Sequence, residues 1–100
     1  MEFSLKMKSL DHKRAADILK TFAHPTRLKI IEELLKGPKC VNDIEELVCK
    51  GQANVSQHLS ILRLSRIVDC EQNGSKKCYF LKEPELAESI LNAIKGRKGV

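Results

Sequence analysis

A β-hairpin is predicted in a chain whose other patterns are helical, and it limits the fold more than any other feature. The strand-like runs RIVDCEQ (residues 66–72) and KKCYFL (residues 76–81) lie on either side of Asn73, Gly74 and Ser75. Asn-Gly between two such runs is a strong hairpin signal. The sequence therefore predicts a fold that is mainly α-helical and contains one small β-hairpin.

Five segments have the apolar spacing of amphipathic helices. They cover residues 11–23, 24–37, 42–48, 51–63 and 82–96. Asp11 is the expected N-cap of the first helix, and Asn42 followed by Glu45 has the pattern of a capping box for the third. Pro25 suits the first turn of the second helix, and Gly37 suits the position just past its end.

The predicted helix at residues 51–63 has two different sides. Val55, Leu59 and Leu62 recur at the spacing of a core-facing stripe. The opposite side consists of polar residues without an acid, namely Gln52, Ser56, Ser60 and Arg63. From Lys50 to Arg66 there are three positive charges and no negative one, although the net charge of the chain is only +5. We interpret this side as a contact surface, with an ordinary solvated helix face as the alternative.

The order of the predicted elements is that of a winged helix-turn-helix, α-α-α-α-β-β-α. Its recognition helix, residues 51–63, would enter the major groove, where Gln and Asn pair with adenine and Arg pairs with guanine. Lysines near the hairpin tip would contact the DNA backbone or the minor groove. The candidate DNA-binding residues are Gln52, Asn54, Ser56, Gln57, Ser60, Arg63, Lys76 and Lys77.

From about residue 14 to residue 94, the chain resembles the ArsR/SmtB family of small winged-helix repressors. The resemblance depends on HPTRL in the second helix and NVSQHL in the recognition helix, within the longer stretches AHPTRLKIIEELLKGPKCVNDIEEL and QANVSQHLSILR. It implies a homodimer built from the first and last helices, whose apolar stripes include Leu19 and Ile94. It also implies binding of double-stranded DNA at an inverted-repeat operator, and release when an inducer, often a soft metal or metalloid, binds the protein.

The chain departs from the family pattern at two places. Arg66 stands where members usually have Gly between the recognition helix and the first strand. It either accepts a left-handed backbone, at a cost of about 1 kcal/mol, or indicates a differently built turn. The last helix has no Asp, His or Cys, so the zinc site that the family places there is absent. At the start of the third helix Cys40 matches the Cys-x-Cys of arsenic and cadmium sensors, but Asn42 occupies the second position.

Four cysteines are the candidate metal or thiol sensor: Cys40, Cys49, Cys70 and Cys78. With a three-residue loop at 73–75, Cys70 would lie opposite Cys78, and the pair could bind one soft ion or oxidise. With a two-residue loop of Asn73 and Gly74, Cys70 would instead face Lys77. A third thiolate from Cys40, Cys49 or a partner subunit would complete a site for As(III). Free cysteine also packs as a small hydrophobe, which is the alternative for Cys49 in particular.

The three histidines have no second histidine or carboxylate at metal spacing. We therefore expect capping or packing roles for His24 and His58, and a solvated side chain for His12.

Length and composition support one domain over residues 1–100, with flexible tails at 1–10 and 97–100. The sequence has no signal-peptide core and no stretch long enough to span a membrane, so we expect a cytoplasmic protein with no membrane partner. In that compartment, cysteines are more often reduced thiols, metal ligands or redox switches than structural disulfides.

The leading hypothesis is a transcriptional repressor, not an enzyme, released from its operator by thiol chemistry with As(III) or another soft metal ion. No cofactor is expected to be required for DNA binding. One alternative is a repressor that senses oxidants or reactive sulfur through a link between Cys70 and Cys78. A further alternative is a protein-interaction module on the same fold. No nucleophile, acid-base pair or Gly-rich phosphate loop at catalytic spacing suggests an enzyme.

Overall fold

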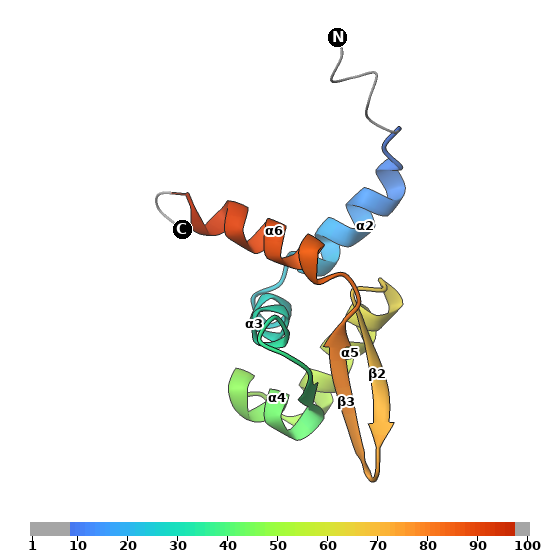
Figure 1. The fold of residues 1–100 in the computed structure, drawn as a ribbon, viewed down its shortest axis with the longest axis vertical. Helices are drawn as coiled ribbons and strands as arrows, with labels where there is room; N and C mark the ends of the chain where they lie inside the picture. The colour runs from blue at the N-terminus through green and yellow to red at the C-terminus, as the bar shows by residue number, and fades with distance from the viewer. Residues whose placement is uncertain (1–8, 98–100) are drawn as a thin grey trace.

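The computed structural model describes residues 9–97, and these form a single winged helix-turn-helix with a three-stranded sheet (Figure 1). Its elements in chain order are α2 (His12–Phe22), α3 (Pro25–Leu34), β1 (Lys39–Cys40), α4 (Val41–Val48), α5 (Gln52–Leu64), β2 (Val68–Asn73), β3 (Lys76–Leu81) and α6 (Pro84–Lys95). The predicted winged-helix fold is confirmed. The tails predicted at 1–10 and 97–100 lie outside the described residues, except for residues 9, 10 and 97, which are in no helix or strand.

The elements divide into two ends (Figure 1). Helices α2 and α6 diverge at one end, and α4 lies at the other end with the tip of the β2–β3 hairpin. Helices α3 and α5 lie between them, so the helix-turn-helix (α4 and α5) and the wing (β2 and β3) come to lie next to each other.

Two of the predicted helix starts are confirmed by their caps. The side chain of Asp11 accepts a hydrogen bond from the backbone N–H of Arg14 at 3.1 Å. The Nδ1 atom of His24 accepts one from the backbone N–H of Thr26 at 3.1 Å, and Pro25 opens α3. His24 therefore has the capping role that the sequence suggested.

The capping box predicted at Asn42 is wrong. Helix α4 starts at Val41, its N-cap is Cys40, and no side chain caps it. The reason is strand β1, a two-residue strand that the sequence pattern did not predict. Pairing with β3 holds Cys40 extended, at φ −77° and ψ 156°, so the helix must begin at the next residue.

The sheet has the strand order β1-β3-β2, and both pairs are antiparallel. In the wing, Asn73 pairs with Lys76, so the loop consists of Gly74 and Ser75. Gly74 has φ +66°, a left-handed conformation that glycine adopts at little cost. Neither predicted loop is therefore correct, because the turn lies one residue later than the two-residue alternative.

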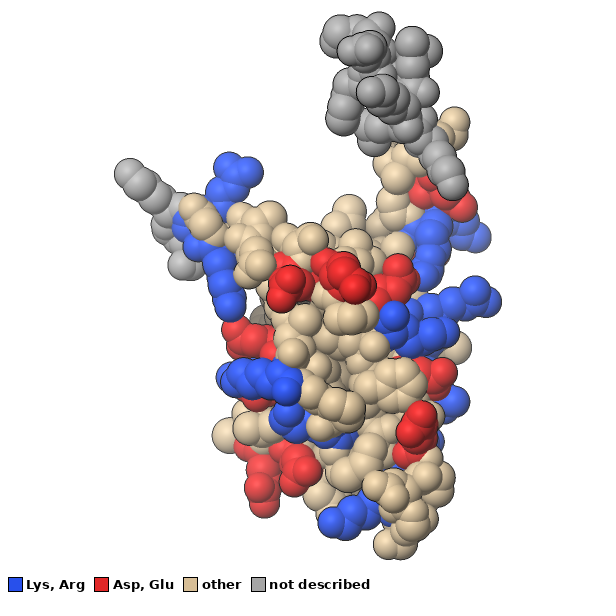
Figure 2. All heavy atoms as spheres, viewed as in Figure 1, with Lys and Arg blue, Asp and Glu red and all other residues tan. Residues whose placement is uncertain are grey.

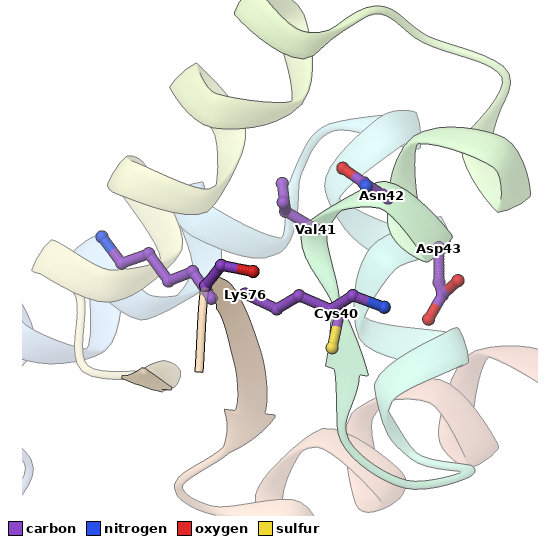
Figure 3. Close-up of a pocket in the computed structure, with 7 residues that line it drawn as sticks. Cys40, Val41, Asn42, Asp43 and Lys76 are labelled. Carbon is purple, nitrogen blue, oxygen red and sulfur yellow. The ribbon is translucent and has the colours of Figure 1, made fainter. Parts of the chain in front are cut away.

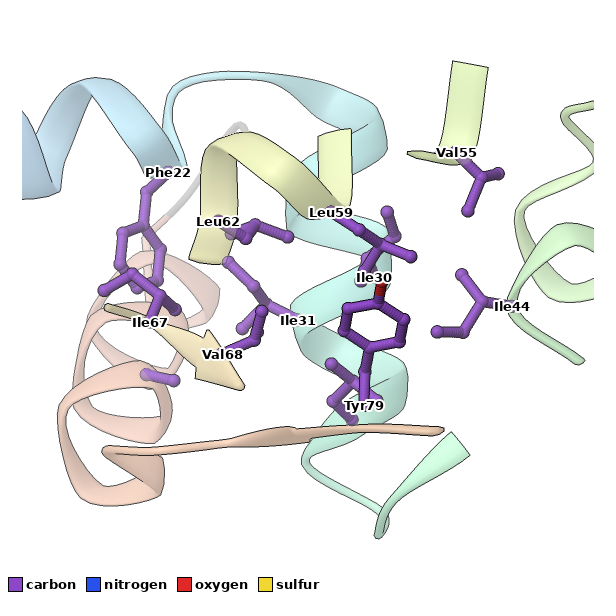
Figure 4. Packing of buried hydrophobic residues seen from close by; sticks show 12 residues of the cluster. Phe22, Ile30, Ile31, Ile44, Val55, Leu59, Leu62, Ile67, Val68 and Tyr79 are labelled. Carbon is purple, nitrogen blue, oxygen red and sulfur yellow. The ribbon is translucent and has the colours of Figure 1, made fainter. Parts of the chain in front are cut away.

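A single apolar core joins the helices to the sheet (Figure 4). Val55, Leu59 and Leu62 of α5 are 0%, 1% and 0% exposed, which confirms the predicted core-facing stripe. Their neighbours in the core include Phe22, Ile30, Ile31, Leu34, Ile44, Ile67, Val68 and Tyr79. By contrast, Leu19 of α2 and Ile94 of α6 are 59% and 41% exposed, so part of each apolar stripe is uncovered in the single chain.

Arg66 adopts the left-handed backbone that was one of the two predicted options, with φ 61°. Its N–H donates to the carbonyl of Arg63 at 3.0 Å, and the N–H of Ile67 donates to the carbonyl of Leu62 at 3.0 Å. These bonds close the end of α5 and turn the chain into β2. Cys49 is also left-handed, at φ 56°, in the turn between α4 and α5.

Candidate DNA-binding interface

The exposed side of α5 is the centre of the candidate interface. All six predicted DNA-binding residues of this helix are exposed: Gln52, Asn54, Ser56, Gln57, Ser60 and Arg63. With 3.6 residues per turn, Gln57 and Ser60 lie opposite the buried stripe, and the other four flank it. The helix therefore offers hydrogen-bonding groups without a carboxylate to any ligand that approaches from this side.

A polar cluster behind α5 holds the helix to α3. His58 is 7% exposed, and its Nδ1 atom lies 3.1 Å from Nη1 of Arg27. Because a guanidinium only donates, Nδ1 accepts and the proton of the neutral ring is on Nε2. Arg27 also donates to the carbonyls of Thr21 and Lys20, at 2.7 and 3.3 Å. The guanidinium therefore connects the end of α2, the start of α3 and the middle of α5.

The electrostatics of this cluster disfavour a charged His58. Burial lowers the pKa of His58 below its usual 6.5, and the electrostatic influence of His24, Arg27 and Lys50 lowers it further. The His24 and His58 rings also contact each other, with centroids 4.4 Å apart. The packing role predicted for His58 is confirmed, and His12 is exposed as expected.

A second cluster ties the C-terminal end of α5 to α2. Nη2 of Arg14 donates to the carbonyl of Ser65 at 3.0 Å, and the hydroxyls of Thr21 and Ser65 are hydrogen-bonded at 2.6 Å. The Thr21 hydroxyl also contacts the carbonyl of Asp17 at 2.9 Å. These hydrogen bonds connect α2 directly to the C-terminal end of α5.

The wing carries the two predicted lysines, Lys76 and Lys77, and both are exposed. An ion pair joins the wing to α5, since Nε of Arg63 lies 3.2 Å from Oδ1 of Asp69 on β2. The pKa of Asp69 is lowered by the backbone N–H of Cys70, which donates to it at 2.8 Å, and by the charge of Arg63. Arg63 thus serves as a bridge between helix and wing in the free protein.

Figure 2 shows acidic and basic side chains interspersed over the face of the molecule in view. Helix α5 itself has no Asp or Glu along its whole length.

The four cysteines are arranged differently from both predicted registers. Cys70 pairs with Tyr79, and Cys78 pairs with Glu71, so Cys70 and Cys78 point to opposite faces of the sheet. The predicted Cys70–Cys78 link is therefore wrong. Instead, Cys78 pairs with Cys40 across β1 and β3, and their sulfurs form a disulfide. Cys70 and Cys49 are free thiols, and Cys49 is exposed.

A surface cavity of about 180 Å³ lies beside this disulfide (Figure 3). It is lined by Cys40, Val41, Asn42, Asp43, Ser75, Lys76 and Lys77. The start of α4 therefore faces the tip of the wing across this cavity. Within residues 9–97, no three His, Cys, Asp or Glu side chains gather closely enough to hold a metal ion.

Sequence reasoning missed the residues that position α5. The roles of Arg27, Arg14 and Ser65 gave no signal, because the Arg27–His58 and Arg14–Ser65 bonds span 31 and 51 residues of the chain. The partial exception is His58, whose place beside the buried stripe indicated a buried ring. A buried imidazole needs a hydrogen-bond partner, which Arg27 provides.

Known proteins similar to this chain are transcriptional regulators. Residues 24–69 match the family described as bacterial regulatory protein, arsR family. The biofilm growth-associated repressor of Xylella fastidiosa (strain Temecula1 / ATCC 700964) is 37% identical over 79 residues, which are 79% of this chain and 68% of the relative.

Solved structures agree in fold. NolR from Sinorhizobium fredii superposes with a TM-score of 0.81 at 28% identity, covering 94% of this chain and 99% of NolR. A homodimeric winged helix-turn-helix DNA-binding domain from Mycobacterium bovis superposes with a TM-score of 0.75 at 20% identity, covering 87% of each chain.

None of the helices within residues 9–97 is both long enough and apolar enough to cross a membrane. The matched family, the relative and the fold agree with the resemblance that the sequence motifs carried. The chain therefore belongs to the ArsR family of bacterial regulatory proteins and is a winged-helix transcriptional regulator, not an enzyme.

Proposed function

We propose that this regulator is a repressor that binds double-stranded DNA through α5 and the wing. One observation carries the proposal. The outer side of α5 is exposed and free of acids, whereas its inner side is completely buried and hydrogen-bonded in place. A helix held so firmly, with a polar side left free, suits insertion into a major groove.

Each predicted contact has its own role in this proposal. Gln52, Asn54, Ser56 and Gln57 lie in the N-terminal half of α5, the half that contacts base edges in helix-turn-helix proteins. Ser60 and Arg63 lie further along, where Arg63 reaches a guanine or a phosphate after leaving Asp69. Lys76 and Lys77 contact phosphates beside the groove.

The repressor acts as a homodimer on an inverted-repeat operator. Leu10, Leu19 and Ile94 are exposed large apolar side chains on or next to α2 and α6, the two helices that diverge from the body. Pairing of these helices between two subunits would cover them. The Mycobacterium bovis domain of the same fold is homodimeric. A twofold axis then places one α5 in each half-site.

Release from DNA follows thiol chemistry in the cytoplasm, and DNA binding itself requires no cofactor. As(III) or a soft divalent metal remains a candidate inducer, since Cys40 and Cys78 provide two neighbouring sulfurs when reduced. A third ligand would then come from a second subunit.

Fluorescence anisotropy of the reduced protein on DNA from its own upstream region tests the repressor proposal. We expect Arg63→Ala to weaken binding to the preferred sequence by about 1–3 kcal/mol and to relax preference at one base position. Lys77→Ala should weaken all sequences alike and flatten the salt dependence. Lys13→Ala, on the exposed part of α2, is the control.

Failure to bind any duplex would contradict the proposal and favour a protein-interaction module. Arsenite and cadmium, titrated separately, test the inducer. Release that a chelator reverses, and that Cys78→Ser abolishes, would support a soft-ion inducer. Tight binding that neither ion changes would exclude both ions as inducers.

A further inference from the structure

The Cys40–Cys78 disulfide connects two parts of the candidate DNA interface. Cys78 lies on β3 of the wing, and Cys40 is both the last residue of β1 and the N-cap of α4. Helix α4 is the first helix of the helix-turn-helix. The bond therefore joins the wing to the helix-turn-helix, across 38 residues of sequence.

The disulfide is a covalent connection at the short edge of the sheet. Strand β1 contributes only two residue pairs, Lys39 with Tyr79 and Cys40 with Cys78. The other edge is much longer, since β2 and β3 share six pairs from Val68–Leu81 to Asn73–Lys76. Opening the disulfide would therefore leave the wing intact as a hairpin, with its edge beside α4 held by the two β1–β3 pairs and by the packing of β3 against α4.

The pair is placed where a reagent in solution can reach it. Both cysteines are partly exposed, and Cys40 lines the surface cavity between α4 and the wing tip (Figure 3). Lys39 and Lys77 are the chain neighbours of Cys40 and Cys78, and Asp43 and Glu71 are the nearby acids. Positive charge close to a thiol favours the thiolate, which is the reacting form.

We infer that Cys40 and Cys78 are a reversible oxidation site for peroxides, and that forming the disulfide lowers the affinity for DNA. The inference rests on the proposed repressor function. One thiolate attacks the O–O bond of the peroxide, giving a sulfenic acid and a hydroxide that takes up the thiol proton to leave as water. The other thiol displaces the sulfenic oxygen as a second water and closes the S–S bond. A thiol reductant reverses the change by exchange.

The expected decrease in DNA affinity on oxidation follows from the two parts that the disulfide joins. In the oxidised form the hairpin is tied to the first residue of α4, and Lys76 and Lys77 border the cavity beside that helix. Phosphate contacts require these lysines to follow the backbone of DNA that α5 has entered. The reduced wing can adjust to that backbone, whereas the oxidised wing is held in the position set by α4.

The test uses a full-length Cys49→Ser/Cys70→Ser variant, which retains only the pair. A matched variant carries Cys40→Ser in addition. Each is measured on operator DNA by anisotropy after reduction, after hydrogen peroxide followed by catalase, and after renewed reduction. Mass spectrometry follows the loss of two hydrogen atoms, and hydrogen exchange follows amides 68–81 without DNA.

We expect oxidation to weaken DNA binding of the pair variant about 10-fold, reversibly, and to leave the matched variant unchanged. Oxidised wing amides should exchange more slowly. A disulfide that forms without changing affinity, or that raises it, would overturn the inference, as would failure of the disulfide to form. If the reduced protein binds no DNA, the proposed function fails. Mass spectrometry and hydrogen exchange would still decide whether Cys40 and Cys78 are an oxidation site that holds the wing.

Discussion

Helix α5 and the wing belong to the same candidate interface but are held in place by different forces. Three apolar residues of α5 are almost completely buried, and a hydrogen bond between Arg27 and His58 holds the inner side of the helix to α3. The wing tip extends beyond the core, with residues 71–77 all exposed. Its edge toward α4 is held by two residue pairs, one disulfide and the packing of β3 against α4.

This difference separates a fixed element from an adjustable one. Burial of apolar surface cannot be switched without unfolding the domain, whereas a disulfide can be opened and closed in the folded state. In the proposed function, base readout belongs to the part of the molecule that does not change. The proposed phosphate contacts belong to the part that a covalent bond helps to hold.

The largest expected effect comes from removing part of the buried side of α5. Leu59→Ala should lower the free energy of unfolding by about 2–5 kcal/mol, because it leaves a cavity at a site that is 1% exposed. Leu64→Ala on the same helix is the control, since Leu64 is 85% exposed. Urea denaturation measures both. Similar losses for the two variants would contradict the stated division between the sides of α5.

The next effect concerns the wing. Replacing both linked cysteines, as Cys40→Ser/Cys78→Ser, should lower the free energy of unfolding by about 2–4 kcal/mol relative to the oxidised protein. Native-state hydrogen exchange should show faster exchange in 68–81 with unchanged protection in α5. Equal loss of protection in α5 would show that the two elements are not held independently.

Arg27→Met keeps the methylene stem but removes the donor to His58, Thr21 and Lys20. We expect a loss of about 1–3 kcal/mol in unfolding free energy, because partly buried acceptors lose their partner. The exposed Lys13→Met should change stability by no more than about 0.5 kcal/mol. Thermal denaturation distinguishes these outcomes, and a neutral Arg27→Met would show that packing alone holds α5.

Arg66→Gly is expected to stabilise the protein, by about 1 kcal/mol, because glycine adopts φ 61° without the steric cost of a side chain. The change lies at the junction between α5 and β2, so it tests whether that turn is strained. The urea midpoint should rise. A decrease would indicate that the Arg66 side chain contributes more than its backbone costs.

The smallest effect is a pH dependence from His58. Its pKa is lowered in the folded protein, first by burial and then by His24, Arg27 and Lys50, so the unfolded chain takes up the proton first. Stability should therefore fall as pH drops from above 6.5 toward the folded pKa. His58→Gln should remove this slope between about pH 5 and 8, and the exposed His12→Gln should keep it.

A slope that persists in His58→Gln would contradict this assignment. The carboxylates of Glu33 and Asp69 do not interfere, because hydrogen bonds lower their pKa values from 4.5 and 3.8. Lys36 and then Lys29 bind Glu33, and the backbone N–H of Cys70 binds Asp69. They titrate below the window measured.

The sequence by itself determined the features that depend on near neighbours in the chain. The core stripe of α5, the His24 cap and the left-handed option at Arg66 are set within one or two helical turns. The motifs HPTRL and NVSQHL were sufficient for the family, because they combine a helix start with a patterned recognition helix. The six exposed residues of α5 followed from the same periodicity.

Only the tertiary structure decided which distant residues meet. A strand register shifts every partner when a turn moves by one residue, so the loop at Gly74 and Ser75 separated Cys70 from Cys78. The two-residue strand β1 is too short to leave a periodic signal, yet its pairing with β3 displaced the helix start from Asn42 to Val41. The same pairing brought Cys40 to Cys78, because cross-strand contacts between remote segments depend on the folded backbone and not on local pattern.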